Sequence, residues 1–537
     1  RVRRGRALIG SFLLRGGRIV DGTGAPWIRG DVLVRDGVIV AVGHVDETAA
    51  AVIDVDGLVV APGFIDMHTH SDLVPLYDRD HSSKACQGVT LEVIGQDGLS
   101  LAPATPQVER ELADGLAGWN GAPDFERGWR SVADYLARFD AGCATNVAFL
   151  VGHGTLRLNV MGSDDRAPSA DELAAMQALL RTALAEGAMG LSAGLTYAPG
   201  MYADDAEIVA LCSAMRGTGA FYAPHHRSYG VGAVEAYAAA IACAEAAGVP
   251  IHLAHTHLGF TVNAGRGAEL MAIIDAARGR GVDVTFDTYP YLAGNTYLHS
   301  ILPGWALADG TDATVARLRD ADLRERLRVD LEDTGTDGFH GVPVDWSWIV
   351  VGGTGDPANA WAVGRSIADL AAERDQRPID LFCELAAADR LMATALHHIG
   401  NEEHVRMFMR HPAHTAGSDG ILVGSRPHPR GWGTMPRYLA HYVRELGILT
   451  LEEAVRHMTS SPAQRLGLLD RGIVRPGMVA DLVAFDPDAI RDTSTYEEPR
   501  RTPEGIPHVW LDGVPTVADG VRTGNLPGRA LRSRFGS

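Results

Sequence analysis

Between about residues 61 and 470, short apolar segments alternate with helix-like segments, and this alternation constrains the fold more than any other feature. The segments that we expect to form strands are 90–94, 145–151, 189–192, 221–223, 251–254, 282–286 and 416–418. Stretches rich in Ala, Leu, Glu and Arg lie between them, and those at 170–187, 205–217, 232–247 and 266–280 are typical of helices. Seven or eight such repeats predict an α/β fold, a (β/α)8 TIM barrel of parallel strands.

The two ends of the chain follow a different pattern. Residues 12–60 and the segment after about 470 contain short apolar runs separated by turns such as Asp36-Gly37, which is typical of β-hairpins. We therefore expect residues 1–62 and 471–537 to build a small β-sandwich together, and residues 63–470 to form the barrel. Residues 306–390 are longer and more polar than a connecting loop, which predicts an inserted lid subdomain.

The composition excludes several classes of partner. The formal net charge is −19, so the chain lacks the basic surface that nucleic-acid phosphates require. No apolar run approaches the roughly 18 residues that cross a bilayer, so we expect no membrane partner. The basic segment 1–6 has no cleavage site after it, and we interpret it as mature sequence. The five cysteines are scattered and form no Cys-x-x-Cys pair, which favours a reducing, cytoplasmic location.

Histidines and acidic residues follow the expected strands, at the end where TIM barrels hold their chemistry. His68 and His70 come after the apolar run 58–65, and a spacing of two on an extended segment places both imidazoles on one side. The full set of side chains at strand ends is His68, His70, Asp97, His225, His255 and Asp419. Four imidazoles and two carboxylates suit zinc, with manganese or iron as less common choices, and the set can hold one ion or two.

Most of the 21 histidines need another interpretation, and a lone His-x-His pair is weak evidence for a metal. His226 and His252 alternate with the proposed ligands, so we expect their rings to point away from the metal. His153 ends a strand, so we expect it to line the site and contact the substrate. Histidines in helical or loop contexts are interpreted as structural: His81, His397, His398, His404, His411, His414 and His441.

Longer motifs lie along most of the chain. They include Ala61-Pro-Gly-Phe-Ile-Asp-Met-His-Thr-His-Ser-Asp72, Val151-Gly-His-Gly-Thr-Leu156, Glu186-Gly-Ala-Met-Gly-Leu-Ser-Ala-Gly-Leu195, Asp287-Thr-Tyr-Pro-Tyr-Leu-Ala-Gly294, Gly417-Ser-Asp-Gly420 and Arg426-Pro-His-Pro-Arg-Gly-Trp-Gly-Thr434. With these motifs the chain resembles the amidohydrolase superfamily and, within it, the N-acyl-D-amino-acid deacylase group. The resemblance implies a TIM-barrel hydrolase that activates water with a bound metal ion to cleave an amide bond.

The resemblance also implies a role for most residues of the strand-end set. His68 and His70, with Asp419 beside them, look like ligands of a more buried metal position. His225 and His255 look like ligands of a second position. Asp419 is expected to take a proton from the attacking water and to pass it to the leaving nitrogen, which is general acid–base catalysis.

The resemblance implies substrate-binding residues as well, and the chain departs from the group's pattern at Asp97 and His257. Tyr289 and Arg430 look like the residues that hold a substrate carboxylate, which the planar guanidinium can bind bidentately. Asp97 stands where the group has a metal-binding Cys, and our hypothesis is that its carboxylate bridges two metals. His257 stands where the group usually has a substrate-binding Lys, and a neutral imidazole holds a carboxylate less strongly. Lys84, the only lysine, lies in a helical stretch, so we expect no carboxylated lysine at the metals.

Three functions are compatible with these residues. The leading interpretation is hydrolysis of a linear amide in a small-molecule substrate, above all an N-acyl-D-amino acid. The alternative is hydrolysis of a cyclic amide, an imide or an N-carbamoyl compound. The shape of the pocket would distinguish this function from the first, whereas the fold and the metal would not. A non-catalytic scaffold would have lost ligands, whereas His68, His70, His225, His255 and Asp419 are all present. The sequence leaves a homo-oligomer open.

Overall fold

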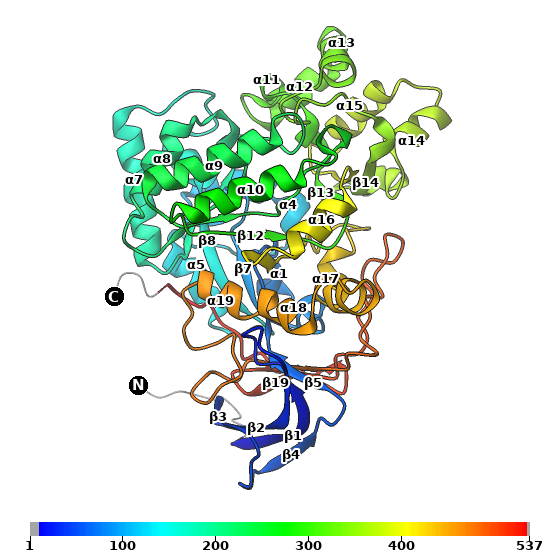
Figure 1. Cartoon of the computed structure of the whole chain (residues 1–537). Helices are drawn as coiled ribbons and strands as arrows, with labels where there is room; N and C mark the ends of the chain where they lie inside the picture. The colour runs from blue at the N-terminus through cyan, green and yellow to red at the C-terminus, as the bar shows by residue number, and fades with distance from the viewer. Residues whose placement is uncertain (1–9, 534–537) are drawn as a thin grey trace.

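A ring of parallel strands forms the centre of the molecule in the computed structural model, which describes residues 10–533 (Figure 1). Eight strands of these residues take part: β6 (Phe64–Asp66), β7 (Val89–Ile94), β8 (Asn146–Gly152), β9 (Gly190–Gly194), β10 (Phe221–His225), β11 (Ile251–Leu253), β12 (Val284–Thr288) and β16 (His414–Ala416). Beyond their ends, the Asp419 N–H donates to the His68 carbonyl at 2.8 Å, and Thr69 bridges Gly420 in parallel. These contacts join the last strand to the first, and the predicted TIM barrel is confirmed.

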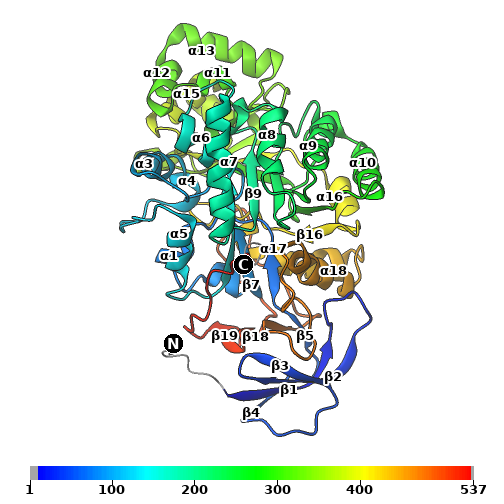
Figure 2. The same cartoon turned by 90° about the vertical axis from the view of Figure 1, so that its left-hand side faces the viewer.

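Helices cover the outside of the barrel, and Figure 2 shows α6, α7 and α8 side by side on it. The helices of this layer are α5 (Val132–Phe139), α6 (His153–Met161), α7 (Ala170–Ala185), α8 (Asp205–Ser213), α9 (Ala233–Ala247), α10 (Gly267–Gly279), α16 (Glu402–Met409), α18 (Leu451–Met458) and α19 (Ser460–Arg465). Ser169 and Glu172 form a capping box that starts α7, and Gly248, with a φ of 69°, ends α9. The four helices expected between the strands are thus confirmed in α7 to α10.

The strands are buried on both faces, which is why they read as continuous apolar runs. Every residue of β7, β8, β9 and β10 is buried. Inside the barrel, Ile65, Leu91, Leu150 and Phe221 belong to one apolar cluster that fills the amino-terminal part of the interior. Apolar side chains therefore fill the amino-terminal part of the barrel interior. The polar side chains lie at the carboxyl ends of the strands.

Segments near both ends of the chain build a second sheet, which lies below the barrel in Figures 1 and 2. Residues 528–531 of the expected segment 471–537 lie instead along β8 of the barrel, where the Leu531 N–H donates to the Val147 carbonyl at 2.8 Å. Among the described residues the second sheet contains β1 (Ser11–Ile19), β2 (Ile28–Arg35), β3 (Val38–Gly43), β4 (Ala51–Asp54), β5 (Val59–Pro62), β17 (Leu482–Phe485), β18 (His508–Leu511), β19 (Val514–Ala518) and β20 (Val521–Arg522). They form one connected sheet that curls until the Ile39 N–H donates to the Met478 carbonyl at 2.9 Å. Asp36 and Gly37 both have positive φ in the turn from β2 to β3, as their sequence predicts.

An insertion between β12 and β16 forms the upper part of the molecule in Figure 1. It consists of β13 (Ala293–Tyr297), β14 (Ile349–Gly353), β15 (Thr394–His398), α11 (Gly304–Leu307), α12 (Thr311–Arg319), α13 (Ala321–Arg328), α14 (Ile367–Glu373) and α15 (Pro378–Ala388). The three strands pair antiparallel in the order β13-β15-β14, and the helices pack on them around a separate core that includes Leu327 and Phe382. Because β13 and β15 flank residues 306–390 and belong to this sheet, the insertion occupies more of the chain than that range.

The connections fix which end of the barrel faces which neighbour. β5 ends at Pro62 and β6 begins at Phe64, so the terminal sheet lies at the amino ends of the barrel strands. The insertion begins a few residues after β12, so it lies at the carboxyl ends. Short helices fill the remaining connections: α1 (Val74–Tyr77), α2 (Ser82–Ala85), α3 (Pro106–Gly115), α4 (Ala117–Asn120) and α17 (Arg430–Arg437). The polar ends of the strands therefore open toward the insertion.

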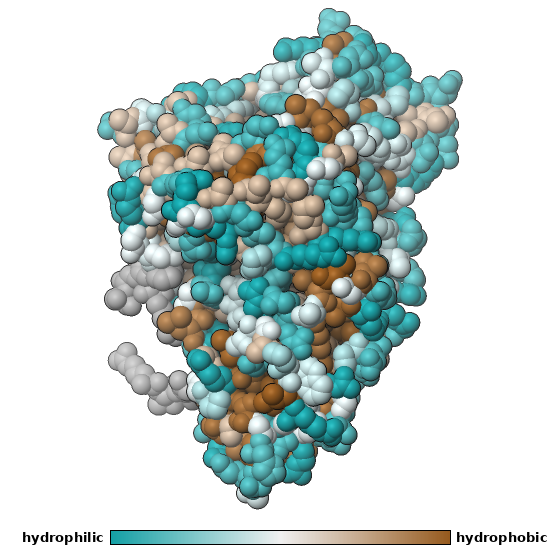
Figure 3. Space-filling model, in the orientation of Figure 1, coloured by the Kyte–Doolittle hydropathy of each residue, from teal (hydrophilic) through white to brown (hydrophobic). Residues whose placement is uncertain are grey.

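Figure 3 shows hydrophilic and hydrophobic residues mixed over the barrel and the insertion on one face, with hydrophobic residues also gathered lower down, near α17 and over the terminal sheet. In residues 10–533 we find no helix with the length and apolar character needed to cross a membrane. The expectation for the basic segment 1–6, and the parts of the two sandwich segments at 1–9 and 534–537, lie outside the described residues.

Candidate metal centre and substrate cavity

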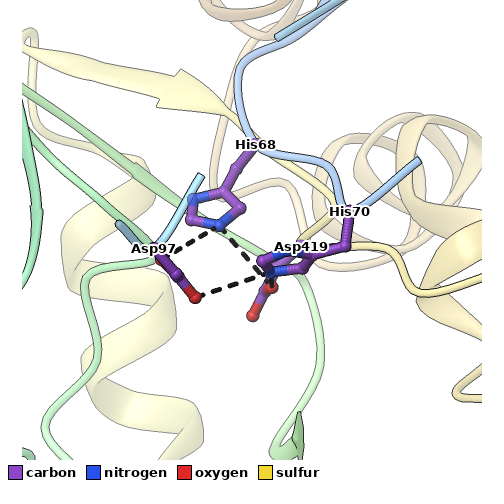
Figure 4. A group of neighbouring side chains, drawn as sticks. All are labelled: His68, His70, Asp97 and Asp419. Atoms are coloured by element: carbon purple, nitrogen blue, oxygen red, sulfur yellow. Dashed lines mark hydrogen bonds and ion pairs between the residues drawn. The ribbon is translucent and has the colours of Figure 1, made fainter. Parts of the chain in front are cut away.

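Two groups of ligand atoms meet at the carboxyl ends of the barrel strands. One group contains His68, His70, Asp97 and Asp419, and the other contains Asp97, His225 and His255. Within each group the ligand atoms lie within 4.8 Å of one another, and every residue is buried. Figure 4 shows the first group, with the side chains of Asp97 and Asp419 converging on the two imidazoles. The structure therefore brings together all six residues of the predicted ligand set.

Asp97 belongs to both groups because its two carboxylate oxygens face all four histidines. Oδ1 lies 3.6 Å from Nε2 of His68 and 3.3 Å from Nε2 of His255. Oδ2 lies 3.5 Å from Nε2 of His70 and 3.4 Å from Nδ1 of His225. Each oxygen thus stands between one histidine of the first group and one of the second. The Asp97 carboxylate therefore lies between the two groups and could be shared by ions bound to each of them.

The backbone holds three of these predicted ligands in conformations that residues other than glycine rarely adopt. Asp97, His255 and Asp419 have φ values of 55°, 30° and 50°. Such left-handed residues cost on the order of 1–3 kcal/mol each and persist where the surrounding structure enforces them. The loop that carries Asp97 packs tightly against the end of β9, since a Cβ added at Gly98 would lie 2.4 Å from the Gly194 nitrogen. The loop after β7 therefore presses against its neighbour and aims the Asp97 carboxylate inward.

The electrostatics of the site favour a cation. Burial lowers the pKa of the His70 imidazole, but Asp419 and Asp97 outweigh burial and raise it to about 9. Burial likewise lowers the pKa of His255, and Asp97 outweighs it to give about 9. Among the described residues, neither ring nitrogen of His68 has a hydrogen-bond partner, and neither does Oδ1 of Asp97. Buried polar atoms without partners are rare in proteins, and a metal ion bound by these atoms satisfies them.

Asp287, at the end of β12, supports the ligands from behind. Its Oδ2 lies 3.7 Å from Nδ1 of His68 and 3.0 Å from Nε2 of His252, and its Oδ1 accepts the N–H of His255 at 3.0 Å. A carboxylate in this place fixes the orientation of ligating imidazoles. Asp287 directly follows the expected strand 282–286, so its role could have been predicted by the same rule as the ligands, but it was missed. His252 faces Asp287 rather than the ligand groups, and His226 packs on Tyr237, as predicted for both.

Lys84 lies beneath the site and contacts neither ligand group. Its buried Nζ donates to Oδ2 of Asp66 at 2.7 Å and to Oγ of Ser418 at 2.8 Å. Asp66 in turn accepts the N–H groups of His68 and Ser418 through Oδ1. The only lysine of the chain is thus engaged in a buried ion pair, and Asp97 rather than a modified lysine stands between the two groups.

A cavity opens above the ligands, and the barrel and the insertion share its walls. The barrel side carries His70, Asp97, His225, His255 and Asp419 together with Trp119, Tyr197, Tyr229, His257 and Tyr289. The insertion side carries Asn295, Gly338, His340, His397 and Ile399 among others. Two of the expected substrate-binding residues, His257 and Tyr289, therefore line the cavity. Their rings lie 4.1 Å apart, centre to centre, and Nε2 of His257 is 2.9 Å from Oγ1 of Thr288.

Arg430 lies just behind this wall. Its guanidinium stacks over the Tyr289 ring at 4.5 Å, and its Nη1 lies 2.9 Å from Oδ2 of Asp419. Burial raises the pKa of the Asp419 carboxyl, but Arg430 and the nearby histidines outweigh burial and hold it well below its usual range. Arg430 is fully buried and does not line the cavity, while its Nε has no hydrogen-bond partner among the described residues.

The structure corrects two expectations about histidines. His153 does not line the cavity: its ring is buried in α6, and its Nε2 lies 2.7 Å from Oε1 of Glu207, which also binds Arg157. We therefore drop His153 from the substrate-binding residues. His397 lines the cavity instead of being structural, because β15 faces the barrel mouth. Tyr229, whose hydroxyl lies 3.0 Å from Nδ1 of His255, and His340 were missed, since both sit in loops without a periodic pattern.

A TIM barrel with two groups of imidazole and carboxylate ligands at its mouth has the architecture of a metal-dependent hydrolase. The chain belongs to the amidohydrolase family, whose model matches residues 51–517. It is 36% identical over 528 residues to a D-aminoacylase of Alcaligenes xylosoxydans xylosoxydans, an alignment that covers 97% of each chain. The resemblance stated from the motifs is thereby confirmed.

Two solved structures agree with this assignment. The N-acyl-D-glutamate deacylase of Bordetella bronchiseptica, complexed with zinc and a phosphonate inhibitor that mimics the tetrahedral intermediate, has a TM-score of 0.83 and 34% identity. The match covers 97% of this chain and 99% of that one. A D-aminoacylase with a binuclear metal centre, studied for one-metal activation and second-metal attenuation, has a TM-score of 0.81 and 36% identity over the same shares.

Proposed function

We propose that the protein is a zinc-dependent N-acyl-D-amino-acid deacylase that hydrolyses a linear amide bond. The observation that carries the proposal is the position of Asp97, with an oxygen within 3.6 Å of each of the four histidines, at the floor of the cavity. The 36% identity to a D-aminoacylase over nearly the whole chain supports the choice of substrate. The six residues of the two ligand groups would hold zinc, which when bound would lower the pKa of water and polarise the amide carbonyl.

Asp419 is the proposed general base and acid. Its Oδ1 is 3.0 Å from Nε2 of His70, and its side chain lines the cavity beside the ligand atoms. A carboxylate in this place can take the proton of the attacking water and deliver it to the leaving nitrogen. Arg430, bound to the second oxygen, keeps this carboxylate ionised and fixes its orientation.

The proposed partners of a substrate carboxylate are Arg430, Tyr289 and His257. Arg430 lies behind the Tyr289 ring and already uses Nη1 for Asp419 and Nη2 for the Asn295 carbonyl. A carboxylate would therefore have to displace Tyr289 to reach Nε, which has no hydrogen-bond partner among the described residues. Burial lowers the pKa of His257 to about 3, so this imidazole offers a hydrogen bond rather than a positive charge. The carboxylate is therefore held by one shared cation and neutral donors, with less attraction than a lysine at position 257 would give.

Metal analysis combined with a substrate panel tests the proposed function. Protein purified without chelators should contain zinc and should hydrolyse N-acetyl-D-amino acids at least about 100-fold faster than their L-enantiomers. Hydantoin and dihydropyrimidine serve as the cyclic comparison, and activity confined to them would favour the cyclic alternative. Protein without bound metal or turnover would favour a scaffold role. A homo-oligomer and a cytoplasmic location remain predictions, which gel filtration with light scattering and cell fractionation would check.

A further inference from the structure

Two histidines of the insertion face the cavity with ring nitrogens that nothing binds. His397, on β15, is 6% exposed, and its Nε2 has no hydrogen-bond partner among the described residues. His340, in the loop before β14, also lines the cavity, and its Nδ1 has no partner there either. The two lie close enough for a charge on His397 to lower the pKa of His340, and the ring of Phe339 contacts that of His397 at 5.7 Å. A buried polar atom without a partner in a ligand cavity indicates that the ligand supplies one.

Contacts of both the backbone and the ring fix the position of His340. Its φ is 60°, and its carbonyl accepts the N–H of Val231 at 2.9 Å. Its ring contacts that of Tyr229 at 5.3 Å, and Tyr229 binds the ligand candidate His255. The left-handed backbone of a non-glycine residue is a strained state that persists where a site enforces it. The pair of imidazoles therefore forms a preformed wall one ring away from the metal ligands.

The wall carries no positive charge. Burial lowers the pKa of His340 to about 3 and that of His397 to about 4, so both rings are neutral near pH 7. No lysine or arginine of residues 10–533 lines the cavity, since Lys84 is buried below the ligands and Arg430 lies behind Tyr289. A second carboxylate placed here would lose its water without gaining a cation, which is strongly unfavourable.

We propose that His340 and His397 form the subsite for the substrate side chain, and that this subsite selects an uncharged, hydrogen-bonding group and rejects an acidic one. The proposal rests on the proposed function and names its substrate class: N-acyl-D-amino acids with neutral polar side chains. Each neutral ring can donate or accept, so a carboxamide can bind both nitrogens at once. The preference sets this chain apart from the similar N-acyl-D-glutamate deacylase, whose substrate carries a second carboxylate.

Three acetylated substrates of similar length test the subsite, namely N-acetyl-D-glutamine, N-acetyl-D-glutamate and N-acetyl-D-methionine. The first pair differs in charge, and the glutamine and methionine derivatives differ in hydrogen bonding. For the zinc-loaded protein we expect kcat/KM for the glutamine derivative to exceed that for the glutamate derivative by at least about 10-fold. His397→Leu should lower kcat/KM for the glutamine derivative about 10-fold more than for the methionine derivative, and His397→Gln should restore most of the difference.

His398→Leu is the matched control, because His398 is the exposed neighbour on the opposite face of β15 and should leave the three ratios unchanged. Equal turnover of the glutamine and glutamate derivatives would overturn the subsite. So would a His397→Leu loss that is the same for all three substrates, since that is the result of a merely structural role.

Binding of the same compounds by isothermal titration separates this proposal from the proposed function. If no compound is hydrolysed but the glutamine derivative binds at least about 10-fold more tightly than the glutamate derivative, the deacylase function fails and the subsite stands. Equal affinity for the two overturns the subsite whether or not turnover occurs.

Discussion

We expect the number of bound metals to depend on Asp97. Its two oxygens are shared between the two groups of histidines, and without its charge the pair His225 and His255 keeps no anionic ligand of its own. We predict that Asp97→Asn, which preserves shape but removes the charge, lowers zinc content from about two ions per chain to about one or fewer. Activity should fall at least about 100-fold, because loss of even outer-shell partners costs 10- to 100-fold.

Mass spectrometry of metals after gel filtration measures the zinc content of the Asp97→Asn protein. Asp205→Asn is the control: Asp205 is an exposed carboxylate on α8 that pairs with Arg227, and its loss should leave the zinc content unchanged. Two tightly held zinc ions in Asp97→Asn protein would show that Asp97 does not bridge.

Asp287 acts on the metal through other residues. Its carboxylate orients His68, His252 and the backbone N–H of His255 at once. Asp287→Asn should therefore weaken zinc binding about 10- to 100-fold, measured by competition with a chelating dye. Asp283→Asn is the matched control at the other end of β12, where Asp283 pairs with Arg465 away from the site. An unchanged zinc affinity in Asp287→Asn would remove Asp287 from the support of the ligands.

At the scale of elements, one buried ion pair joins the first and last strands of the barrel. Lys84 of α2 binds Asp66 at the end of β6 and Ser418 after β16, and all three are buried. We predict that Lys84→Met destabilises the protein by about 3–5 kcal/mol, because it leaves the Asp66 carboxylate buried without a cation. The apparent melting temperature of the zinc-loaded protein measures this loss.

The control for the Lys84→Met variant is Arg390→Met. Arg390 pairs with Asp312 on the surface of the insertion, with both side chains mostly exposed, and such pairs contribute little to stability. Equal melting temperatures for the Lys84→Met and Arg390→Met proteins would contradict the role of Lys84 as the link across the barrel seam.

The elements also explain what the sequence could predict. The barrel strands were predictable because burial on both faces makes each a short apolar run, and the ligands were predictable because they follow those runs. The contact between Arg430 and Asp419 could not be predicted, because Arg430 begins a helix and its sequence pattern does not indicate which side faces the site. His340 and His397 were missed because only the fold of the insertion brings them over the barrel mouth. The prediction for His153 was wrong because a histidine at the end of a strand can also begin the next helix, as His153 does, where it pairs with Glu207.

At the scale of the whole molecule, the terminal sheet and the insertion hold opposite ends of the barrel. The sheet joins both chain ends beneath the amino ends of the strands, and the Gly63 N–H donates to the Asp481 carbonyl at 2.8 Å across it. The insertion closes over the carboxyl ends and contributes one wall of the cavity. The ligand loops at the carboxyl ends of the strands carry left-handed residues and buried polar atoms without hydrogen-bond partners among the described residues. Such a site is incomplete without its ion.

Metal binding should therefore stabilise the whole fold. An ion that binds only the folded protein adds roughly 2.7 kcal/mol when its free concentration is 100 times its Kd. We predict that zinc-loaded protein melts at a higher temperature than protein treated with a chelator, and that this difference shrinks in Asp97→Asn, which has fewer ligands to offer. Scanning calorimetry of the four samples measures both effects. Magnesium, which prefers all-oxygen ligands, should not replace zinc. Identical melting curves with and without zinc would mean that the six converging residues do not hold a metal in the folded chain.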